Sequence, residues 1–312
     1  MRTALLAGVV AAGLAAAGCG GADRTASDPA AENGALLSGA PFADVSEIVL
    51  PLDDYLLNGA ELRAVARART GLVDECVLRF TQESYVEVAV GVTPAFSPYR
   101  FGLVGTTSAA RWGYHDPDDE LSESFARAHP VRTPPGTPTA AHLLDGRLPI
   151  GSERPLDPGG KTLPKDGCVG DAEAFLGGPV AESGFVSRAV TEIEEAERTD
   201  PRVQDAISDW VACMTDTGHD YANPLDPVVE LGGAAAITPE ERAVAIADAA
   251  CRASTSYVER RVAILAELQE RSLAADQGRW DAYRADQQDR LHKARGYLDL
   301  VAASGEAEEA AS

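Results

Sequence analysis

The amino terminus constrains this chain most, because it decides in which compartment the chain folds. An apolar run from Ala4 to Ala17 follows the basic Arg2, and two glycines with Asp23 and Arg24 end it. The run is too short to cross a bilayer, which takes about 20 apolar residues. A basic start, a short apolar core and small residues after it are typical of a secretory signal. We therefore expect the chain to fold outside the cytoplasm.

Cys19 makes this signal more specific. The segment Ala16-Ala17-Gly18-Cys19 resembles the end of a bacterial lipoprotein signal, which is cleaved before the cysteine. The resemblance implies a signal peptide over 1–18 and a lipid-modified Cys19 that holds the protein on the extracytoplasmic face of the cell membrane. The alternative is a plain secretory signal cut near Gly18, because Ala16 stands where lipoproteins usually carry a larger aliphatic residue.

Four further cysteines, Cys76, Cys168, Cys213 and Cys251, predict two disulfides in an exported chain. Four cysteines allow three pairings. We favour Cys76 with Cys168, which ties a helix to a long irregular loop, and Cys213 with Cys251, which staples two adjacent helices. No C-x-x-C pair is present, which disfavours metal binding by these residues.

Composition favours a helical protein with a thin core. Hydrophobic residues make up 45% of the 312 residues, but much of this is alanine and only 6% is aromatic. The net charge is −22, from 27 basic and 49 acidic residues. Such a polyanion is repelled by nucleic acid and by anionic lipid headgroups, so we expect no nucleic-acid partner and attachment to the membrane through the lipid alone.

Three capping signals place the clearest helices. Asn58 with Glu61 predicts a helix that carries Cys76 on its apolar face, and Gly71 weakens its middle. Thr199-Asp200-Pro201 ends one helix and starts the next, whose apolar face holds Trp210 and Met214 as core residues. Thr238-Pro239-Glu240-Glu241 opens the last helix, which we expect to run past residue 297 with at most one interruption, near Gly278. Its predicted buried stripe begins Ala243, Ile246, Ala247, Ala250 and Cys251.

The stretch from Gly91 to Gly170 is rich in proline and glycine and breaks both periodicities. Short helices are expected around 122–128 and 139–144, and 85–90 alternates like a strand. The sequence therefore predicts a mainly α fold, with disulfide-stapled helices, a long irregular segment and a long C-terminal helix. We divide it into a signal peptide (1–18), a flexible tether (19–41), an N-terminal helix with the irregular region (42–170), a helical region (171–303) and a disordered acidic tail (304–312).

Four short segments carry a resemblance. They are Arg111 to Pro117 (RWGYHDP), Leu163 to Cys168 (LPKDGC), Trp210 to Met214 with Gly218 and Tyr221, and Asp248 to Cys251. Together they resemble a group of actinomycete secreted proteins and lipoproteins with a W-x-x-C-M…G…Y helix end and a D-x-x-C helix. The resemblance implies export and supports the two cysteine pairs. It carries no activity; the place of some such genes beside export-type transporter components hints at an accessory role in the envelope.

Candidate chemistry is sparse. His115 to Glu120 (HDPDDE) could offer oxygen ligands to a hard cation, but it lacks the spacing of a known calcium loop and is better interpreted as a solvated turn. His219 with Asp220 could likewise bind a metal, although a surface role is favoured. No H-E-x-x-H, G-x-S-x-G or phosphate-binding loop occurs. We therefore predict no catalytic, cofactor or metal residue, and no cofactor.

These observations favour a non-enzymatic, lipid-anchored envelope protein that works by contact with another protein. One rival is an extracytoplasmic hydrolase of cell-wall or peptide substrates, whose site is assembled from distant residues. The other is a solute-binding lipoprotein of an importer, which should alternate strands and helices in two lobes.

Overall fold

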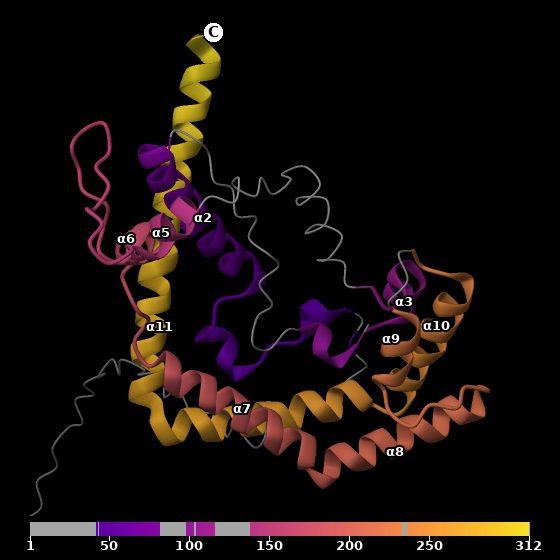
Figure 1. The fold of residues 1–312 in the computed structure, drawn as a ribbon. Helices are drawn as coiled ribbons and strands as arrows, with labels where there is room; N and C mark the ends of the chain where they lie inside the picture. Colours follow the sequence, from indigo (N-terminus) through magenta and orange to yellow (C-terminus); the bar gives the residue numbers. More distant parts are fainter. Residues whose placement is uncertain are drawn as a thin grey trace, which may run out of the picture.

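The computed structural model describes residues 42, 44–81, 98–102, 104–115, 138–232 and 236–311, and in this part the chain is helical, as the sequence predicts (Figure 1). The only pairing of extended backbone among these residues is an isolated bridge between Leu156 and Thr162. The signal segment, Cys19, the expected strand at 85–90 and the expected helix at 122–128 lie outside the described residues.

The elements follow one another along the chain as η1 (Val45–Glu47), η2 (Pro51–Asp54), α2 (Gly59–Thr81), η3 (Pro98–Phe101), α3 (Thr106–Trp112), α5 (Pro138–Asp145), α6 (Gly167–Phe175), α7 (Ser183–Thr199), α8 (Pro201–Asp216), α9 (Asp226–Leu231), α10 (Pro239–Ser254) and α11 (Tyr257–Ala311).

Helix α2 begins where its capping signal predicts. The Asn58 side chain accepts from the Glu61 N–H at 3.0 Å, and the Glu61 carboxylate accepts from the Asn58 N–H at 3.1 Å. The helix packs across the second part of α11, where Gly71 meets Tyr297. A β-carbon at position 71 would come within 2.5 Å of the Tyr297 hydroxyl. The glycine that weakens α2 by propensity is therefore the residue that lets the two helices approach.

The first disulfide joins Cys76 to Cys168, as the sequence predicts. Its surroundings differ from the expectation: Cys168 lies in the first turn of α6 rather than in a loop, so the bond joins two helices. The boundary that we placed after residue 170 falls inside α6. The loop before α6 is held by Arg154, whose guanidinium donates to the carbonyls of Pro164 at 2.8 Å and Lys165 at 3.2 Å.

The largest group of buried residues lies where α7, α8 and the first part of α11 meet (Figure 1). Trp210 and Met214 of α8 are completely buried there, which confirms their assignment to the core. Trp280 of α11 is also fully buried, with the rings of Tyr55 and Phe185 packed edge-on at 6.2 and 5.4 Å between centroids.

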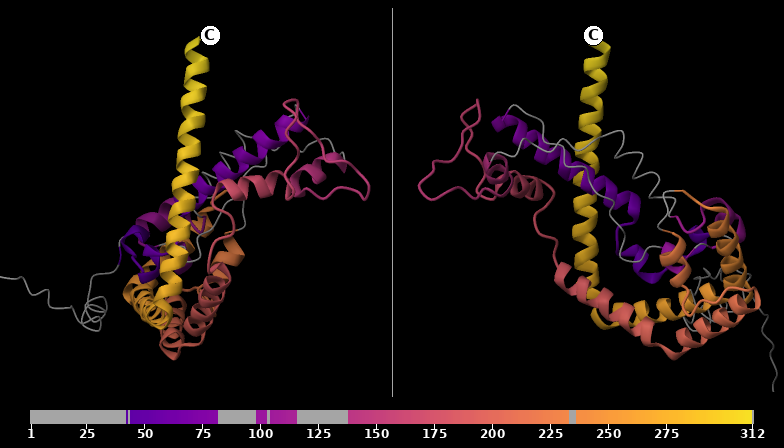
Figure 2. Two further views of the ribbon diagram at one scale, coloured as in Figure 1. Left: turned by 90° about the vertical axis from the view of Figure 1, so that its left-hand side faces the viewer. Right: turned by 45° about the vertical axis from the view of Figure 1, so that its right-hand side comes forward.

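The last helix is broken where the sequence shows no signal. We expected one helix from residue 239 past 297, interrupted at most near Gly278. Instead α10 ends at Ser254, and Ser256 adopts a left-handed conformation with φ of 50° before α11 begins. A second irregularity, a kink at Asp276, lies two residues from the expected one. The part of α11 before the kink packs on α7 and α8. The part after the kink crosses α2 and then projects clear of the other helices (Figure 2).

The predicted buried stripe of α10 was wrong in its face. Of the predicted stripe, Cys251 is buried as expected, but Ala243, Ile246 and Ala250 are exposed, whereas Val244, Ala245, Asp248 and Ala249 are buried. The stripe assumed that the charged residues of α10 face water. Asp248 and Arg252 instead face the core and pair with one another, which rotates the buried face toward them.

Candidate functional site

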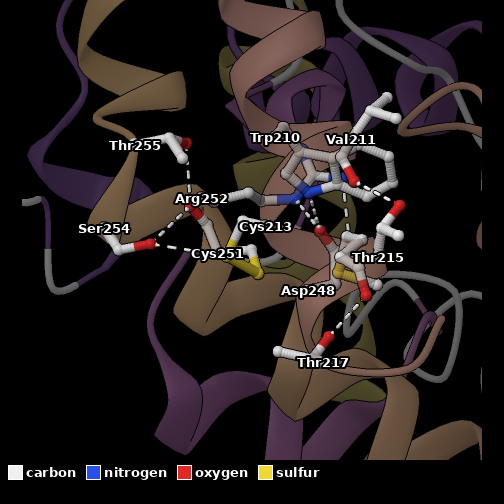
Figure 3. Close-up of a disulfide and its surroundings, with 11 residues drawn as sticks. Trp210, Val211, Cys213, Thr215, Thr217, Asp248, Cys251, Arg252, Ser254 and Thr255 are labelled. Atoms are coloured by element: carbon white, nitrogen blue, oxygen red, sulfur yellow. Dashed lines mark hydrogen bonds and ion pairs between the residues drawn. A yellow bond between two sulfur atoms is a disulfide. The ribbon is translucent and has the colours of Figure 1, made fainter.

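The second disulfide joins α8 to α10 and marks the candidate site. Cys213 and Cys251 are bonded, again as the sequence predicts, with their Cα atoms 5.6 Å apart. Figure 3 shows the bond beside a cluster of polar side chains from the same two helices. Because cysteines that form disulfides cannot act as nucleophiles or metal ligands, the chemistry of this region depends on those polar groups.

Asp248 lies at the centre of the cluster. The Trp210 indole Nε1 donates to Asp248 Oδ1 at 2.7 Å, and Arg252 Nε donates to the same oxygen at 2.6 Å (Figure 3). Arg252 Nη2 donates to Oδ2 at 3.1 Å. Only 4% of either charged side chain is exposed. The aspartate and the arginine, one helical turn apart on α10, thus form a buried bidentate ion pair beneath the indole ring.

A third segment, the turn after α3, reaches the same carboxylate. The Tyr114 hydroxyl donates to Asp248 Oδ2 at 3.3 Å. Burial of the phenol, together with the negative charge of Asp248, raises the pKa of Tyr114 well above its ordinary value. Tyr114 therefore stays a neutral donor. Three of the segments that carry the sequence resemblance, those of Tyr114, Trp210 and Asp248, meet around one carboxylate, although each is far from the others along the chain.

Arg252 also fixes two loops. Its Nη1 donates to the Phe101 carbonyl at 2.6 Å, and its Nη2 donates to the Pro224 carbonyl at 3.2 Å. The guanidinium thus connects the chain before α3, the loop before α9 and helix α10. Such a fork of fixed donors suits arginine and could not be reproduced by lysine.

A second buried carboxylate, Glu241, lies at the start of α10. It caps the helix with Thr238, as the sequence predicts, and its Oε1 also accepts from the Tyr114 N–H at 2.8 Å. His115 Nε2 lies 3.5 Å from the same Oε1. The close approach depends on Gly113, whose φ is +57° and whose β-carbon, if it had one, would collide with the Glu241 carboxylate.

The arrangement suits structural support better than proton transfer. Four donors converge on the two oxygens of Asp248, so the carboxylate has no accepting position left for a substrate proton. No group of three or more histidine, cysteine, aspartate or glutamate side chains in the described part of the chain could hold a metal ion. The residues present can hold loops in place, and this is the chemistry that their geometry supports.

The histidines considered from the sequence do not gather in one place. His115 is brought to Glu241, whereas His219 stacks on Tyr221 with 6.4 Å between ring centroids. His142 lies on α5 and His292 is exposed on α11. The rest of the acidic turn, Asp116 to Glu120, and His129 lie outside the described residues.

Sequence reasoning missed Arg252 and the burial of Asp248 and Glu241. One signal could have found the pair. Asp248 and Arg252 stand at i and i+4 within a helix that is rich in alanine, and this is the spacing of an intrahelical ion pair. The preference of charged residues for the surface argued against placing that pair inside.

Comparison with known proteins adds nothing to this geometry, since no family model, no curated protein and no solved structure matches the chain. In the described part of the chain, none of the helices is both long and apolar enough to cross a membrane.

Proposed function

We propose that this protein is a lipid-anchored accessory protein on the extracytoplasmic face of the cell membrane, and that it works by contact with another envelope protein rather than by catalysis. The observation that carries the proposal is the use of the cysteines. The chain has five, and four of them are joined in two disulfides. Disulfides persist in oxidising compartments, and the remaining cysteine is Cys19, the residue that the signal would present for acylation.

The tether is compatible with such an anchor. The described part of the chain begins at Phe42, whose N–H donates to the Glu259 carboxylate of α11 at 2.9 Å. Residues 20–41 can span at most about 80 Å, at about 3.6 Å per residue. The body could therefore reach partners over a zone of this depth while it stays attached. With a net charge of −22 the body gains no attraction from anionic headgroups, so attachment rests on the lipid.

Two features of the described residues favour a function through contact with another protein over hydrolysis or solute binding. The central carboxylate Asp248 is saturated by donors, which disfavours its use as a general base. A two-lobed solute-binding protein is built on strands, whereas extended pairing in the described part of the chain is limited to the bridge of Leu156 with Thr162.

The anchor is tested by fractionation of cells that express the wild-type chain or Cys19→Ala. We expect the wild-type protein in membranes and in the detergent phase, with a mass increase at Cys19 from a diacylated thioether, because one acyl chain alone binds only marginally. Cys19→Ala should be released or remain uncleaved. A wild-type protein found free in the medium, starting after Gly18 with an unmodified thiol, would contradict the anchor.

Catalysis is tested separately. The purified, oxidised protein should not hydrolyse peptidoglycan, peptides or esters, with or without added Zn²⁺ or Ca²⁺. Turnover that disappears in His115→Ala or His219→Ala would establish the hydrolase alternative instead.

A further inference from the structure

The first turn of α9 presents an apolar pair to solvent, formed by Leu225, which precedes the helix, and Val229 within it. Leu225 and Val229 are 63% and 83% exposed, and the Val229 N–H donates to the Leu225 carbonyl at 3.0 Å, so they lie one turn apart on the same face. The opposite side of the helix carries the buried Pro227. Single exposed aliphatic residues are common on protein surfaces, whereas aliphatic residues that lie together on one helix face can form part of a contact site.

The backbone around this pair is held from several sides. The Arg252 guanidinium holds the Pro224 carbonyl, and the Asn223 side chain accepts from the Leu225 N–H at 3.0 Å. Asp226 accepts from the N–H groups of Asn223 at 2.8 Å and Ala222 at 3.1 Å. A helix of six residues would not persist alone in water. The buried hydrogen bonds of the candidate site therefore help to hold Leu225 and Val229 in place at the surface.

The surface beside the pair is acidic. Between residues 203 and 251 the sequence has nine acidic residues, one arginine and no lysine, and two of the nine acids, Glu241 and Asp248, are buried. Asp226, Glu230 and Glu240 are exposed and lie close enough to Tyr221 to act on its hydroxyl; burial and these three charges raise the pKa of Tyr221. Within the described residues, no arginine or lysine forms an ion pair with any of the three. Asp226 accepts from backbone N–H groups and Glu230 is hydrogen-bonded to Tyr221, but no basic side chain of the described residues neutralises the negative charge of the three.

We propose that the face of α9 formed by Leu225 and Val229, with the acidic ring of Asp226, Glu230 and Glu240, is a docking site for a basic, amphipathic segment of another protein. An aliphatic side chain of that segment would pack on the pair, and its lysines or arginines would meet the ring. This inference rests on the proposed function, and it names the chemistry of the partner.

Charge selects this occupant over two others. A second copy bound through the same face would bring its own acidic ring against the first, and like charges placed together across an interface are costly. An anionic lipid surface would be repelled for the same reason. A cationic protein segment is attracted to the ring and offers the apolar contact that the pair requires.

The site is tested by peptide binding to the mature chain carrying Cys19→Ala. The probe is a labelled 18-residue helical peptide of about one-third leucine in amphipathic spacing, with lysine at the other positions; a second peptide has glutamate in place of lysine. We expect the lysine peptide to bind, and to bind at least about tenfold more weakly to Leu225→Ser/Val229→Ser, which corresponds to about 1.4 kcal/mol or more. The matched control is Ile150→Ser, which alters a fully exposed aliphatic residue in the loop between α5 and α6.

The contribution of the acidic ring is measured with Glu230→Gln/Glu240→Gln. Its control, Glu153→Gln/Glu192→Gln, removes two exposed carboxylates elsewhere. We expect several-fold weaker binding of the lysine peptide only in the first variant, and a loss of that difference at 0.5 M salt. The site is wrong if the lysine peptide does not bind, if the serine variant binds within twofold of wild type, if Ile150→Ser weakens binding equally, or if the glutamate peptide binds as tightly.

Photocrosslinking in native membranes separates this inference from the proposed function. A photoreactive residue at position 229 should join a protein segment of net positive charge, identified by sequencing, and one at position 150 should not. Protein crosslinks at other surface positions but not at 229, or crosslinks at 229 to lipid or to a second copy, would overturn the docking site and leave the contact function standing. An absence of protein crosslinks at every position would overturn both.

Discussion

The two disulfide-bonded regions of the molecule hold their charges in different places. Around Cys76–Cys168, where α2, α5, α6 and the second part of α11 meet, the central acid is Glu173. It pairs with Arg69 at 2.7 Å and Arg290 at 2.5 Å and is one-third exposed. Around Cys213–Cys251, Asp248 and Glu241 are buried together with Arg252. The first region places its ion pairs at the edge of an apolar interior, whereas the second buries them beside apolar residues such as Trp210 and Met214.

Two regions that each contain one disulfide are therefore held together by different interactions. The interior of the first is apolar, with Val73, Val77, Leu143 and Leu163 packed around the disulfide. In the second, α3 packs on α10 mainly through alanines, among them Ala109 and Ala245, which bury little area. The hydrogen bonds of Asp248, Glu241 and Arg252 supply the directional contacts that the small side chains cannot. Buried polar groups of this kind fix one arrangement but tolerate no missing partner.

The largest expected effect is the loss of a disulfide, which compares the regions directly. In the chain-entropy account, removing Cys76–Cys168, with 92 residues between its ends, costs about 4.6 kcal/mol, and removing Cys213–Cys251, with 38, costs about 3.9 kcal/mol. Each double alanine variant, in a chain that also carries Cys19→Ala, should be compared by urea unfolding. If the Cys213–Cys251 variant is the less stable one, local packing rather than loop length decides the stabilisation.

The next effect compares the cost of neutralising the buried Asp248 with that of neutralising Glu173, which is one-third exposed. Asp248→Asn keeps the shape of the side chain but leaves Arg252 buried without a counter-ion, and we expect a loss of about 3–5 kcal/mol. The matched variant Glu173→Gln leaves Arg69 and Arg290 nearer to water, and its cost should be about 1 kcal/mol or less. Urea unfolding of the two variants provides the measurement. Equal losses would show that the regions do not differ in the way their charges are held.

The sequence allowed much of the first region and half of the second to be predicted. The capping residues Asn58, Asp200 and Thr238 are local signals, because each acts on a backbone N–H within three residues, and all three caps form as expected. Both cysteine pairs also form as predicted, although only Cys213–Cys251 was expected to join two helices, and Cys76–Cys168 was expected to join a helix to a loop. These predictions require little knowledge of how the helices pack.

The rest depends on contacts that are distant in sequence. The position of Arg252 is decided by carbonyls at 101 and 224, and nothing in the sequence of α10 indicates them. The break between α10 and α11 likewise has no proline or glycine; Ser256 takes the left-handed conformation that turns the chain. The hydrophobic periodicity continues across this break and leaves Asp248 off the apolar face. A prediction based on it therefore placed the buried face of α10 on the wrong side.

Alkaline pH should lower the free energy of unfolding by a smaller amount, and the two regions should contribute to this loss in the same way. Tyr114 donates to Asp248 and Tyr297 donates to Glu75, one in each region, and burial followed by the neighbouring carboxylate raises the pKa of both phenols above 10. The folded state thus binds a proton that the unfolded state loses above pH 10. Stability should be complete below this pH and fall above it, by up to about 1.4 kcal/mol per pH unit for each tyrosine.

The variants Tyr114→Phe and Tyr297→Phe test this dependence. Each should make the decline between pH 10 and 11.5 shallower than in the wild type, as measured by urea unfolding at several pH values in the Cys19→Ala chain. A Tyr114→Phe curve parallel to the wild-type curve would mean that this phenol is not held against Asp248.

The smallest effect is expected from the end of α11. Among the residues of α11 whose side chains are described, which end at 304, Tyr297 is the last buried one, and the side chains of residues 299–304 are all exposed. In both views of Figure 2 the end of the helix stands clear of the rest of the chain. Deleting 299–312 should therefore change the free energy of unfolding by less than about 0.5 kcal/mol, as for surface changes in general.

Tyr297→Ala, one turn earlier, should cost about 3 kcal/mol, because it removes a ring packed against Phe175 and α2. Thermal unfolding followed by circular dichroism distinguishes the two. A large loss from the deletion would mean that the end of α11 stabilises the region around Cys76–Cys168. The stability of that region would then not come from its disulfide and its apolar interior alone.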